Sequence, residues 1–528
     1  MELHSQKILA ALKELARQLH WDGSIEIVAL SADTREALDS LFQSMRHKLS
    51  ECPPDELPYL ARESRSTFEA EAPYRLVMVF TRTEDTQGPV WDTDSVLEAT
   101  AQALESNSDE TAWQTPSSFY GRGTRPGRVA FLFPGQGSQY LHMGRDLVTW
   151  FPEAMEALES AAQAHVAEQP LTDRIYPRFS EAQNSRQCEE ALRHTAVAQP
   201  AIGGISVAME KILRRFGLAP DATCGHSYGE LTALYSAGWI DEDTLHQLSS
   251  LRGRLMAEAG GRPGEPNGAM LAVKAPLDDL DRLLEAENLD VVLANRNSPR
   301  QGILSGDVES IERAEAVCKT HKYRTVRLPV SAAFHSRLVE SAREPFAAAL
   351  QSIALHPGTT PVYSNTTGEP YPTDVDAIRT LLGNHLRNPV NFVAEIETLY
   401  NHGGRIFIEV GPKTVLTGLV RTILKGRSCH ALAMDASNGK NFAIADLARL
   451  LSQLAALGCP IRWDEWESQE DPPPKLKMRI PIAGANYRAP KPKSKPRLTK
   501  ARPSTAAGNT RLAKSPAAVS DRPETSVV

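Results

Sequence analysis

Hydrophobic and polar positions at the start of the chain alternate in patterns that predict a small folded unit. Apolar residues recur at helical spacing over Ser5–Leu19, and Ile25–Leu30 and Tyr74–Thr81 have strand patterns. Asp33–Glu36 has the composition of a capping box, which predicts that a helix begins there. A Gly-, Arg- and Pro-rich stretch then interrupts the pattern. We therefore predict an N-terminal α+β domain over residues 1–125, which leads as a linker into the rest of the chain.

A buried parallel sheet is predicted in the middle of the chain. Val129–Phe133 is an uninterrupted apolar run, as expected for a strand that is covered on both faces. Helical patterns separate it from a second short strand before Gly225, and Arg405–Val410 has the pattern of a further core strand. This alternation predicts an α/β fold. We assign residues 126–267 and 331–455 to one large α/β domain.

Residues 268–330 interrupt the pattern of the large domain. Their strand and helix signals follow in the order β-α-β-β-α-β, which is typical of a ferredoxin-like module. Strands are expected at Gly268–Val273, Leu289–Ala294, Gln301–Ser305 and Tyr323–Val330, and helices at Leu277–Glu285 and Val308–Thr320. Because the large-domain pattern resumes afterwards, we predict that this small domain is inserted into the large one.

The last part of the chain changes in composition. We expect residues 456–487 to form a linker, because the run Pro472–Pro474 interrupts any regular pattern. Residues 488–528 are rich in Lys, Arg, Pro, Ser, Thr and Ala and contain almost no large apolar side chains. Such a segment cannot bury a core, so a disordered basic tail is predicted.

The overall composition excludes some classes of protein. Of 528 residues, 41% are hydrophobic and 23% are charged, and the net charge is −7. This balance favours no nucleic-acid partner, and no apolar run approaches the ~20 residues that a membrane span needs. The six cysteines form no CxxC pair, and the first residues lack a signal-peptide pattern. We expect a cytoplasmic protein without a metal site.

The segment Gly225–Gly229 has the G-x-S-x-G pattern of a nucleophile elbow. A strand pattern at Ala222–Cys224 precedes it and a helical pattern follows, so Ser227 is predicted to lie exposed at a tight strand-to-helix turn. Free N–H groups at such a helix start stabilise an oxyanion, at ~3 kcal/mol per donor. With the parallel sheet, the motif predicts an α/β-hydrolase-like large domain. A serine that merely caps a glycine-rich turn is the alternative.

An arginine and a turn are further candidates. The segment Asp243–Ala259 has a helical pattern, and Arg252 lies along its apolar stripe, whereas Arg254 lies on the polar face beside Glu258. An arginine that points inward needs an anion, which is either a structural carboxylate or a substrate carboxylate held by the guanidinium fork. The turn Gly135–Gly137, which ends a core strand, is a candidate second oxyanion donor; an ordinary loop is the alternative.

A general base must lie within hydrogen-bond distance of the serine. His226 adjoins Ser227, but neighbouring side chains usually diverge, so His226 is a poor candidate. His335 follows the inserted module on a loop where the chain returns to the large domain. We therefore predict that His335 is the base, although most of the 14 histidines must be structural or exposed.

Several motifs occur together in one order along the chain. They are Phe133–Ser138, Gln199–Pro200, Gly225–Gly229, Arg252–Met256, Asn297–Pro299, Ala333–Ser336, Asn388–Val390 and Glu409–Pro412. As a set they resemble the malonyl-CoA:acyl-carrier-protein acyltransferase family, and within it the acyltransferase domains of type I polyketide synthases and polyunsaturated-fatty-acid synthases. The resemblance covers roughly residues 128–430.

The resemblance implies a ping-pong reaction in which malonyl moves from coenzyme A to Ser227, and then to the phosphopantetheine thiol of an acyl carrier protein. His335 would be the general base, and Arg252 would bind the free carboxylate of the extender unit. The backbone N–H groups of Gln136 and Tyr228 would form the oxyanion hole. No bound cofactor is implied, and the partners would be the carrier protein and ketosynthase or other synthase domains. Three further residues occupy family positions at the substrate pocket: Gln199, His226 and Asn297.

Substrate selectivity is suggested by Ala332–His335. The malonyl-type signature of the family is His-Ala-Phe-His, and the methylmalonyl type has serine in place of the phenylalanine. Phe334 would crowd an α-methyl group, so malonyl is favoured, although Ala332 departs from the first histidine of the signature. His385 is a second departure, because many stand-alone members have a glutamine there whose backbone carbonyl orients the catalytic histidine.

Two other classes of function remain open from the sequence. An acyl hydrolase or editing thioesterase would use the same serine–histidine pair, and a non-catalytic docking module would only hold a carrier protein. The sequence contains neither a ketosynthase cysteine motif nor a carrier-protein Asp-Ser-Leu motif. We expect either a stand-alone transferase or a piece of a larger synthase.

Overall fold

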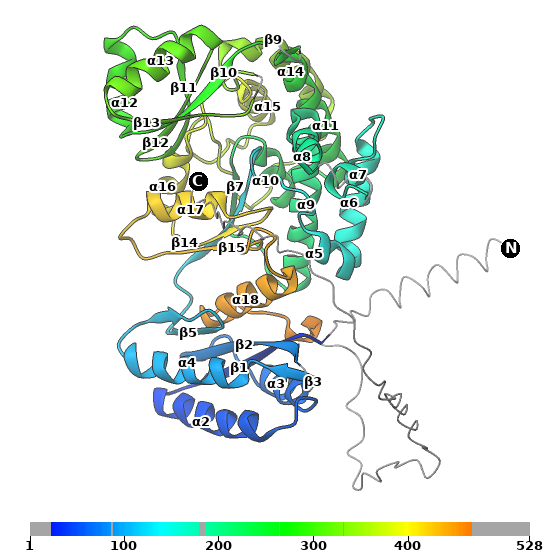
Figure 1. Ribbon diagram of the computed structural model, residues 1–528, viewed down its shortest axis with the longest axis vertical. Coiled ribbons are helices and arrows are strands. Elements are labelled where there is room, and N and C mark those ends of the chain that lie inside the picture. The colour runs from blue at the N-terminus through cyan, green and yellow to red at the C-terminus, as the bar shows by residue number, and fades with distance from the viewer. Residues whose placement is uncertain (1–22, 86–87, 179–184, 263–264, 331, 467–528) are drawn as a thin grey trace, which may run out of the picture. The chain divides into compact units, whose positions relative to one another are not determined.

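The computed structural model describes residues 23–85, 88–178, 185–262, 265–330 and 332–466 (Figure 1). The helix predicted over residues 5–19, most of the predicted linker 456–487 and the predicted tail 488–528 lie outside the described residues. In the described part, no helix is both long and apolar enough to cross a membrane.

The first described elements form an antiparallel sheet with the strand order β1-β2-β5-β4, and β3 pairs with β2. The strands are β1 (Ile25–Ala32), β2 (Tyr74–Asp85), β3 (Gly88–Trp91), β4 (Ala112–Gln114) and β5 (Ser118–Arg122). The helices are α2 (Arg35–Glu51), α3 (Leu57–Ser66) and α4 (Thr93–Ser106). The predicted capping box is wrong by one residue: Thr34 is the N-cap of α2, and its side chain accepts from the Ala37 N–H at 3.1 Å, because Thr34 rather than Asp33 is the last extended residue.

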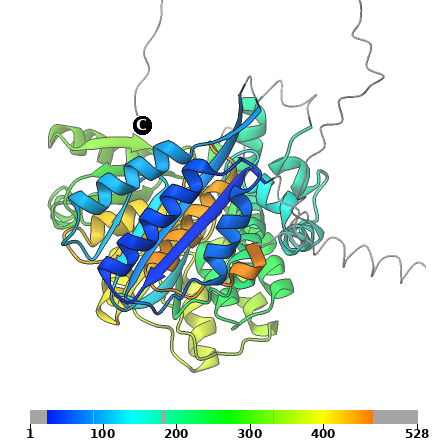
Figure 2. The same ribbon diagram turned by 90° about the horizontal axis from the view of Figure 1, so that it is seen from below.

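Both faces of this first sheet are covered. Alternate residues such as Val28, Met78 and Phe80 pack with α2, α3 and α4. Residues of the opposite face, including Ile27 and Val79, belong to the core that contains α18 (Ala443–Ala456). Figures 1 and 2 show α18, coloured orange, on the side of the sheet opposite the blue helices. The sheet is therefore buried on both faces.

The large sheet is parallel, as predicted, and its strand order is β15-β14-β6-β7. Its strands are β6 (Arg128–Phe133), β7 (Ala222–Gly225), β14 (Gly404–Glu409) and β15 (His430–Ala433). The surrounding helices include α5 (Arg145–Trp150), α6 (Pro152–Ala164), α7 (Leu171–Ile175), α8 (Ser185–Arg193), α9 (Thr195–Arg215), α10 (Gly229–Ser236), α11 (Glu242–Ala259), α14 (Glu340–Ser352), α15 (Val375–Asn384), α16 (Phe392–Asn401) and α17 (Val415–Ile423). The carboxyl ends of neighbouring strands β6 and β7 lie at one edge of the sheet, where ligand sites of parallel sheets form.

An antiparallel sheet with the strand order β11-β12-β10-β13 follows α11 and the short β8 and β9. Its elements are β10 (Ala269–Lys274), α12 (Leu277–Ala286), β11 (Val292–Ser298), β12 (Gln301–Gly306), α13 (Val308–Thr320) and β13 (Arg324–Arg327). They enclose a core of their own with residues such as Leu271, Leu304 and Ile311. β11 begins three residues later than predicted, because Asn288 has the left-handed φ of 47° and turns the chain after α12.

Candidate active site

Ser227 lies at the turn between β7 and α10 and has a left-handed φ of 52°. A non-glycine residue in that conformation stores ~1–3 kcal/mol of strain. Glycine is required on both sides of it: a Cβ on Gly225 would overlap the backbone of Gly229, and a Cβ on Gly229 would overlap the carbonyl oxygen of Phe133. The sequence pattern therefore produces the sharp strand-to-helix turn that it predicted.

His335 is hydrogen-bonded to the serine. Its Nε2 lies 2.9 Å from Ser227 Oγ. Its Nδ1 lies 2.9 Å from the carbonyl oxygen of Asn388 and 3.1 Å from that of His385. Two backbone carbonyls require a proton on Nδ1, which leaves Nε2 as the acceptor for the serine proton. A carbonyl pair thus takes the orienting role that a carboxylate has in a catalytic triad.

The environment of His335 keeps the ring neutral. Its side chain is buried. Burial, together with the nearby Arg252 cation, lowers the pKa of His335 to about 3. A ring with so low a pKa is unprotonated at neutral pH, so the lone pair of Nε2 is free to face the Ser227 hydroxyl.

Arg252 is placed on α11 with its guanidinium against the nucleophile. It is 1% exposed. Its Nη1 donates to Gln199 Oε1 at 2.9 Å, and its Nη2 lies 3.4 Å from Ser227 Oγ. Its Nε has no hydrogen-bond partner, and no carboxylate of the described residues forms an ion pair with it. Burial lowers the pKa of Arg252 to about 10, so it remains a cation at neutral pH.

The two interpretations of the arginine are thereby separated. Arg254, two residues away, is exposed and lies 3.8 Å from Glu258, as the helix pattern predicted. Arg252 has no such carboxylate among the described residues. Glu230 acts on Arg252 only at longer range. Because a buried cation without a directly paired carboxylate is costly, the place next to Ser227 is suited to an anionic ligand.

His226 and Asn297 lie together on the other side of the serine. His226 Nε2 is 2.8 Å from Asn297 Oδ1, and this contact links the elbow to β11. His226 makes no hydrogen bond to Ser227, which agrees with its exclusion as a base. Burial lowers the pKa of His226, so it adds no charge beside the nucleophile at neutral pH.

The turn after β6 approaches the elbow closely. A Cβ on Gly135 would overlap the carbonyl oxygen of His226, so this turn and the elbow are in backbone contact. The backbone N–H groups of Gln136 and Tyr228 donate to no acceptor in the described part of the chain. Two free donors therefore lie on the segments that flank Ser227, as an oxyanion hole requires.

A cavity of about 690 Å³ opens beside the elbow. It is lined by Gln136, His226 and Asn297 near the nucleophile. Apolar residues of the segment 268–330 and of α17 form its walls, including Ile303, Leu328, Leu416 and Leu419. Phe334 lies one residue before the base and is 8% exposed. The volume is in the range of small-molecule sites.

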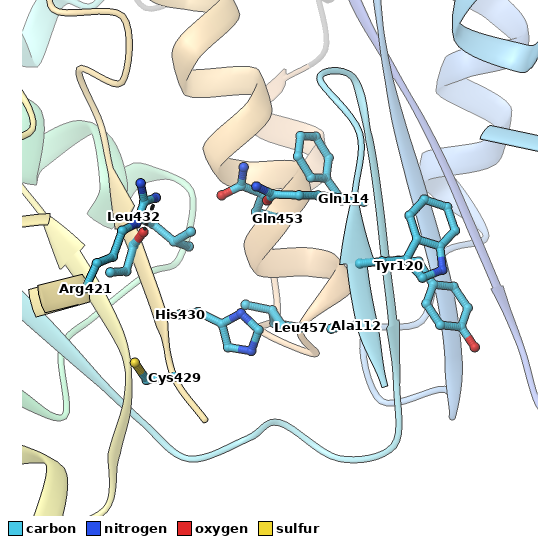
Figure 3. Close-up of a pocket in the computed structure, with 12 residues that line it drawn as sticks. Ala112, Gln114, Tyr120, Arg421, Cys429, His430, Leu432, Gln453 and Leu457 are labelled. Atoms are coloured by element: carbon cyan, nitrogen blue, oxygen red, sulfur yellow. Dashed lines mark hydrogen bonds between the residues drawn. The ribbon is translucent and has the colours of Figure 1, made fainter. Parts of the chain in front are cut away.

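A second pocket, of about 370 Å³, lies between β4 and β5 on one side and β15 and α18 on the other. Figure 3 shows Arg421, His430 and Gln453 around it. None of the candidate residues lines this pocket. It is therefore separate from the serine–histidine pair.

The sequence did not single out the buried polar residues behind the elbow. They are Glu230, Asn365, Tyr371 and Glu395, which are all buried. Only Glu230 gives a signal, because it is an acidic residue in an otherwise apolar segment directly after the motif. The others lie more than 130 residues from Ser227, as the Ser227–Asn365 separation of 138 shows, and only the tertiary fold brings them to it.

Comparisons with known proteins agree with this geometry. Residues 130–452 match the model of the acyl transferase domain. The chain belongs to the acyl transferase domain family. It is 32% identical over 396 residues to a polyunsaturated fatty acid synthase subunit from a Thraustochytrium species, a match that covers 72% of this chain and 14% of that protein. The chain therefore corresponds to a small part of that relative.

Other relatives are of similar size to the matched region. The malonyl CoA-acyl carrier protein transacylase of Escherichia coli O157:H7 is 36% identical over 311 residues, which cover 58% of this chain and 96% of that protein. Among solved structures, the acyltransferase domain from the second module of the salinomycin polyketide synthase matches with a TM-score of 0.61 and 28% identity, over 83% of this chain and 94% of that one. A malonyl-transacylase in complex with a type II polyketide synthase acyl-carrier protein matches with a TM-score of 0.53 and 32% identity, over 61% of this chain and 99% of that one.

Proposed function

We propose that this chain transfers a malonyl unit from coenzyme A, through an ester on Ser227, to the phosphopantetheine thiol of an acyl carrier protein in polyketide or fatty-acid-type biosynthesis. The proposal rests above all on Arg252, a buried guanidinium that has no carboxylate partner among the described residues and whose Nη2 lies 3.4 Å from Ser227 Oγ. A malonyl thioester has a free carboxylate two bonds from its reacting carbonyl. The guanidinium and the nucleophile are close enough to engage both ends of that unit.

The first half-reaction begins at the hydrogen bond between Ser227 and His335. Nε2 accepts the serine proton while Oγ attacks the thioester carbonyl. The resulting oxyanion accepts hydrogen bonds from the N–H groups of Gln136 and Tyr228. The tetrahedral intermediate then collapses, the carbon–sulfur bond breaks, and the imidazolium of His335 returns its proton to the departing thiolate.

The second half-reaction runs in the opposite sense. His335 takes the proton of the phosphopantetheine thiol, and the thiolate attacks the malonyl ester. The ester bond to Ser227 breaks, and the imidazolium protonates Oγ. Coenzyme A and the carrier protein thus use the same groups in turn, and the chain needs no bound cofactor for either step.

The finer assignments follow the same reasoning. Phe334 beside the base favours malonyl over a donor with an α-methyl group, and Gln199 holds Arg252 in place through the 2.9 Å hydrogen bond. The large domain predicted over residues 126–267 and 331–455 is α/β-hydrolase-like, since a serine elbow follows a parallel strand. The small domain predicted over residues 268–330 is ferredoxin-like, since its elements follow in the order β-α-β-β-α-β and its strands form one antiparallel sheet. Besides the carrier protein, ketosynthase or other synthase domains are the expected partners.

An acyl hydrolase is the rival function, because the same pair could pass the acyl group to water. A hydrolase for neutral acyl chains has no use for a buried guanidinium at the nucleophile. The test is a comparison of products after incubation with malonyl-CoA, with and without holo-carrier protein. We expect malonyl carrier protein to be the main product; predominant release of free malonate in the presence of carrier protein would contradict the transferase.

A docking module is the other rival, and the nucleophile tests it. We expect Ser227→Ala to abolish covalent labelling by malonyl-CoA while the protein remains folded, since Ser227 is only partly buried. His335→Ala should slow labelling by ~10²–10⁴-fold. Intact mass spectrometry measures both. If Ser227→Ala carried the label as well as the wild type, the acyl-enzyme would lie elsewhere.

A further inference from the structure

Glu230 has no role in the reaction described above, although it lies three residues after the nucleophile. It occupies the first turn of α10, and its side chain is 0% exposed. A carboxylate is retained in such a place only where hydrogen bonds or cations replace its lost hydration. Its partners therefore indicate what the carboxylate holds in position.

Three segments from elsewhere in the chain reach this carboxylate. Tyr371 Oη donates to its Oε1. The backbone N–H of Asn365 donates to its Oε2 at 3.1 Å. The ring Nε2 of His385 lies 3.3 Å from the same Oε2. One oxygen thus connects two residues, each of which contacts one member of the catalytic pair.

Asn365 is the contact on the nucleophile side. Its Oδ1 accepts from the backbone N–H of Ser227 at 2.6 Å. Its Nδ2 donates to the carbonyl oxygen of Gly225 and, at 2.9 Å, to Glu395 Oε2. One amide therefore holds the peptide groups on both sides of the strained turn. Its own backbone is held by Glu230.

His385 is the contact on the base side. Its carbonyl oxygen accepts from Nδ1 of His335 at 3.1 Å, and the two rings lie with centroids 5.5 Å apart. The His385 side chain is 1% exposed, and its Nε2 faces Glu230. Neither ring nitrogen of His385 makes a hydrogen bond, so Glu230 acts on this residue by close packing against a neutral ring, and through it on the carbonyl that orients the base.

We propose that Glu230 is a positioning residue that sets the alignment of Ser227 and His335. Its carboxylate acts through Asn365 on the nucleophile side and through His385 on the base side. The inference rests on the proposed function, in which the pair reacts with an acyl thioester. Glu230 touches neither reacting atom. Its loss is therefore expected to slow acylation without weakening donor binding.

The protonation of Glu230 gives a second readout. The titratable and charged groups that face it are Tyr371, His385, Arg252, Cys224 and, across Asn365, Glu395. Burial raises the pKa of Glu230 to about 7, although the hydrogen bonds from Tyr371 and Asn365 and the Arg252 cation favour the ionised form. The ionised carboxylate accepts from the Tyr371 hydroxyl and the Asn365 N–H, whereas a protonated carboxyl presents an O–H that competes with them.

The two histidines near Glu230 do not titrate in the same range. Burial and the Arg252 cation hold the pKa of His335 at about 3. Burial also lowers the pKa of His385 well below its usual value, and burial together with Glu230 raises that of Glu395 well above its own. The acylation rate of the wild type should therefore fall as the pH decreases through about 7.

The main test compares Glu230→Gln with a matched control, Glu210→Gln. Glu210 is also buried, at 1% exposure, but it pairs with Arg214 and Ser236 and contacts none of the catalytic residues. We expect Glu230→Gln to slow single-turnover malonylation of Ser227 by ~10–100-fold, as misalignment of reacting groups does. Its KM for malonyl-CoA should stay within ~2-fold, since other groups bind the donor. The fall of the acylation rate as the pH decreases through about 7 should be absent in this variant.

Several outcomes would overturn the proposal. They are a wild-type acylation rate in Glu230→Gln, an equal loss of rate in the control, or a rise in KM for malonyl-CoA with no change in the rate of acylation. Labelling of Ser227 by a fluorophosphonate separates this inference from the proposed function, because that reagent reports the activation of the serine without a malonyl donor. If the wild type is phosphonylated but not malonylated, the function fails, and a slower phosphonylation of Glu230→Gln still supports the positioning role.

Tyr371→Phe is a milder second variant in case Glu230→Gln fails to fold. It keeps the ring and removes only the hydroxyl that donates to Oε1. We expect acylation and phosphonylation to slow by ~3–10-fold, with KM unchanged. Wild-type rates in this variant would show that the orientation of the carboxylate does not matter to the pair.

Discussion

Among single residues, the site is defined by a charge and by hydrogen-bond donors that lack ordinary partners. Among the described residues, Arg252 is buried without an ion pair, and the N–H groups of Gln136 and Tyr228 have no acceptor. Ser227 retains a strained φ of 52°. A folded protein keeps such features only where something else requires them, and a malonyl thioester would pair with the guanidinium and both N–H groups at once.

Arg252→Ala should separate donors by their charge. A charge-assisted pair of hydrogen bonds contributes about 1.5–3 kcal/mol, so malonyl transfer should fall by ~10–100-fold while acetyl transfer changes little. Arg252→Lys keeps the charge but loses the fork and should lie between the two. The measurement is kcat/KM for malonyl-CoA and acetyl-CoA. Equal losses for both donors would refute the carboxylate role.

The residues that the sequence predicted are those with a local signal. Ser227 stands in a five-residue motif, and Arg252 is marked by its position on an apolar helix face. Asn365 and His385 act on the pair through hydrogen bonds that span 138 and 50 residues. No spacing rule reports such contacts. The Asn365 contact follows only from the tertiary structure, and the role of the His385 carbonyl was expected only through the family resemblance.

At the scale of elements, the elbow depends on how closely α10 approaches β6. Gly229 begins α10 directly under the end of β6, and any Cβ there would overlap the Phe133 carbonyl oxygen. A side chain would push the helix away from the strand. The position of the nucleophile is thus set by contact between backbones.

Gly229→Ala should therefore destabilise the fold by about 1–3 kcal/mol, the usual range for overpacking, and should slow the labelling of Ser227. Gly418→Ala is the matched control, because Gly418 is an exposed residue of helix α17 and a Cβ there would meet nothing within 4 Å. The control should be more stable by ~0.5–1 kcal/mol. Urea denaturation measures both. Equal stabilities of the two variants would contradict the close approach.

Elements were predicted best where the apolar pattern alone decides them. The helix α13 (Val308–Thr320) has the predicted bounds, and α11 begins one residue earlier than expected. The start of α2 was shifted by one residue, because both Asp and Thr can cap a helix and the backbone angles decide which of the two does so. Boundaries are therefore less predictable than the elements themselves.

At the scale of the whole molecule, the N-terminal sheet shares a core with the last long helix of the described chain, α18. Arg75 on β2 is 1% exposed and donates to the carbonyl oxygens of Ala456, Gly123 and Ala72. A Cβ on Gly121 would overlap the Ala456 carbonyl oxygen. The described residues belong to one compact unit. The boundary placed near residue 125 remains a prediction from composition.

Arg75→Ala should test this joint packing. It leaves three carbonyl groups without their donor, two of them on the buried residues Ala72 and Ala456, which we expect to cost about 2–4 kcal/mol. Arg254→Ala, at a position with 63% side-chain exposure, should change stability by less than ~0.5 kcal/mol. Thermal unfolding followed by circular dichroism measures both. An unchanged Tm for Arg75→Ala would show that the sheet and α18 unfold independently.

The passage of the acyl group through Ser227 can be followed by mass spectrometry. The wild type is incubated with malonyl-CoA, digested, and examined by peptide mass spectrometry before and after addition of holo-carrier protein. We predict malonate on the peptide that contains Ser227, and its transfer to the phosphopantetheine thiol when the carrier protein is added. A malonyl label on another residue, or one that the carrier protein never removes, would contradict the account.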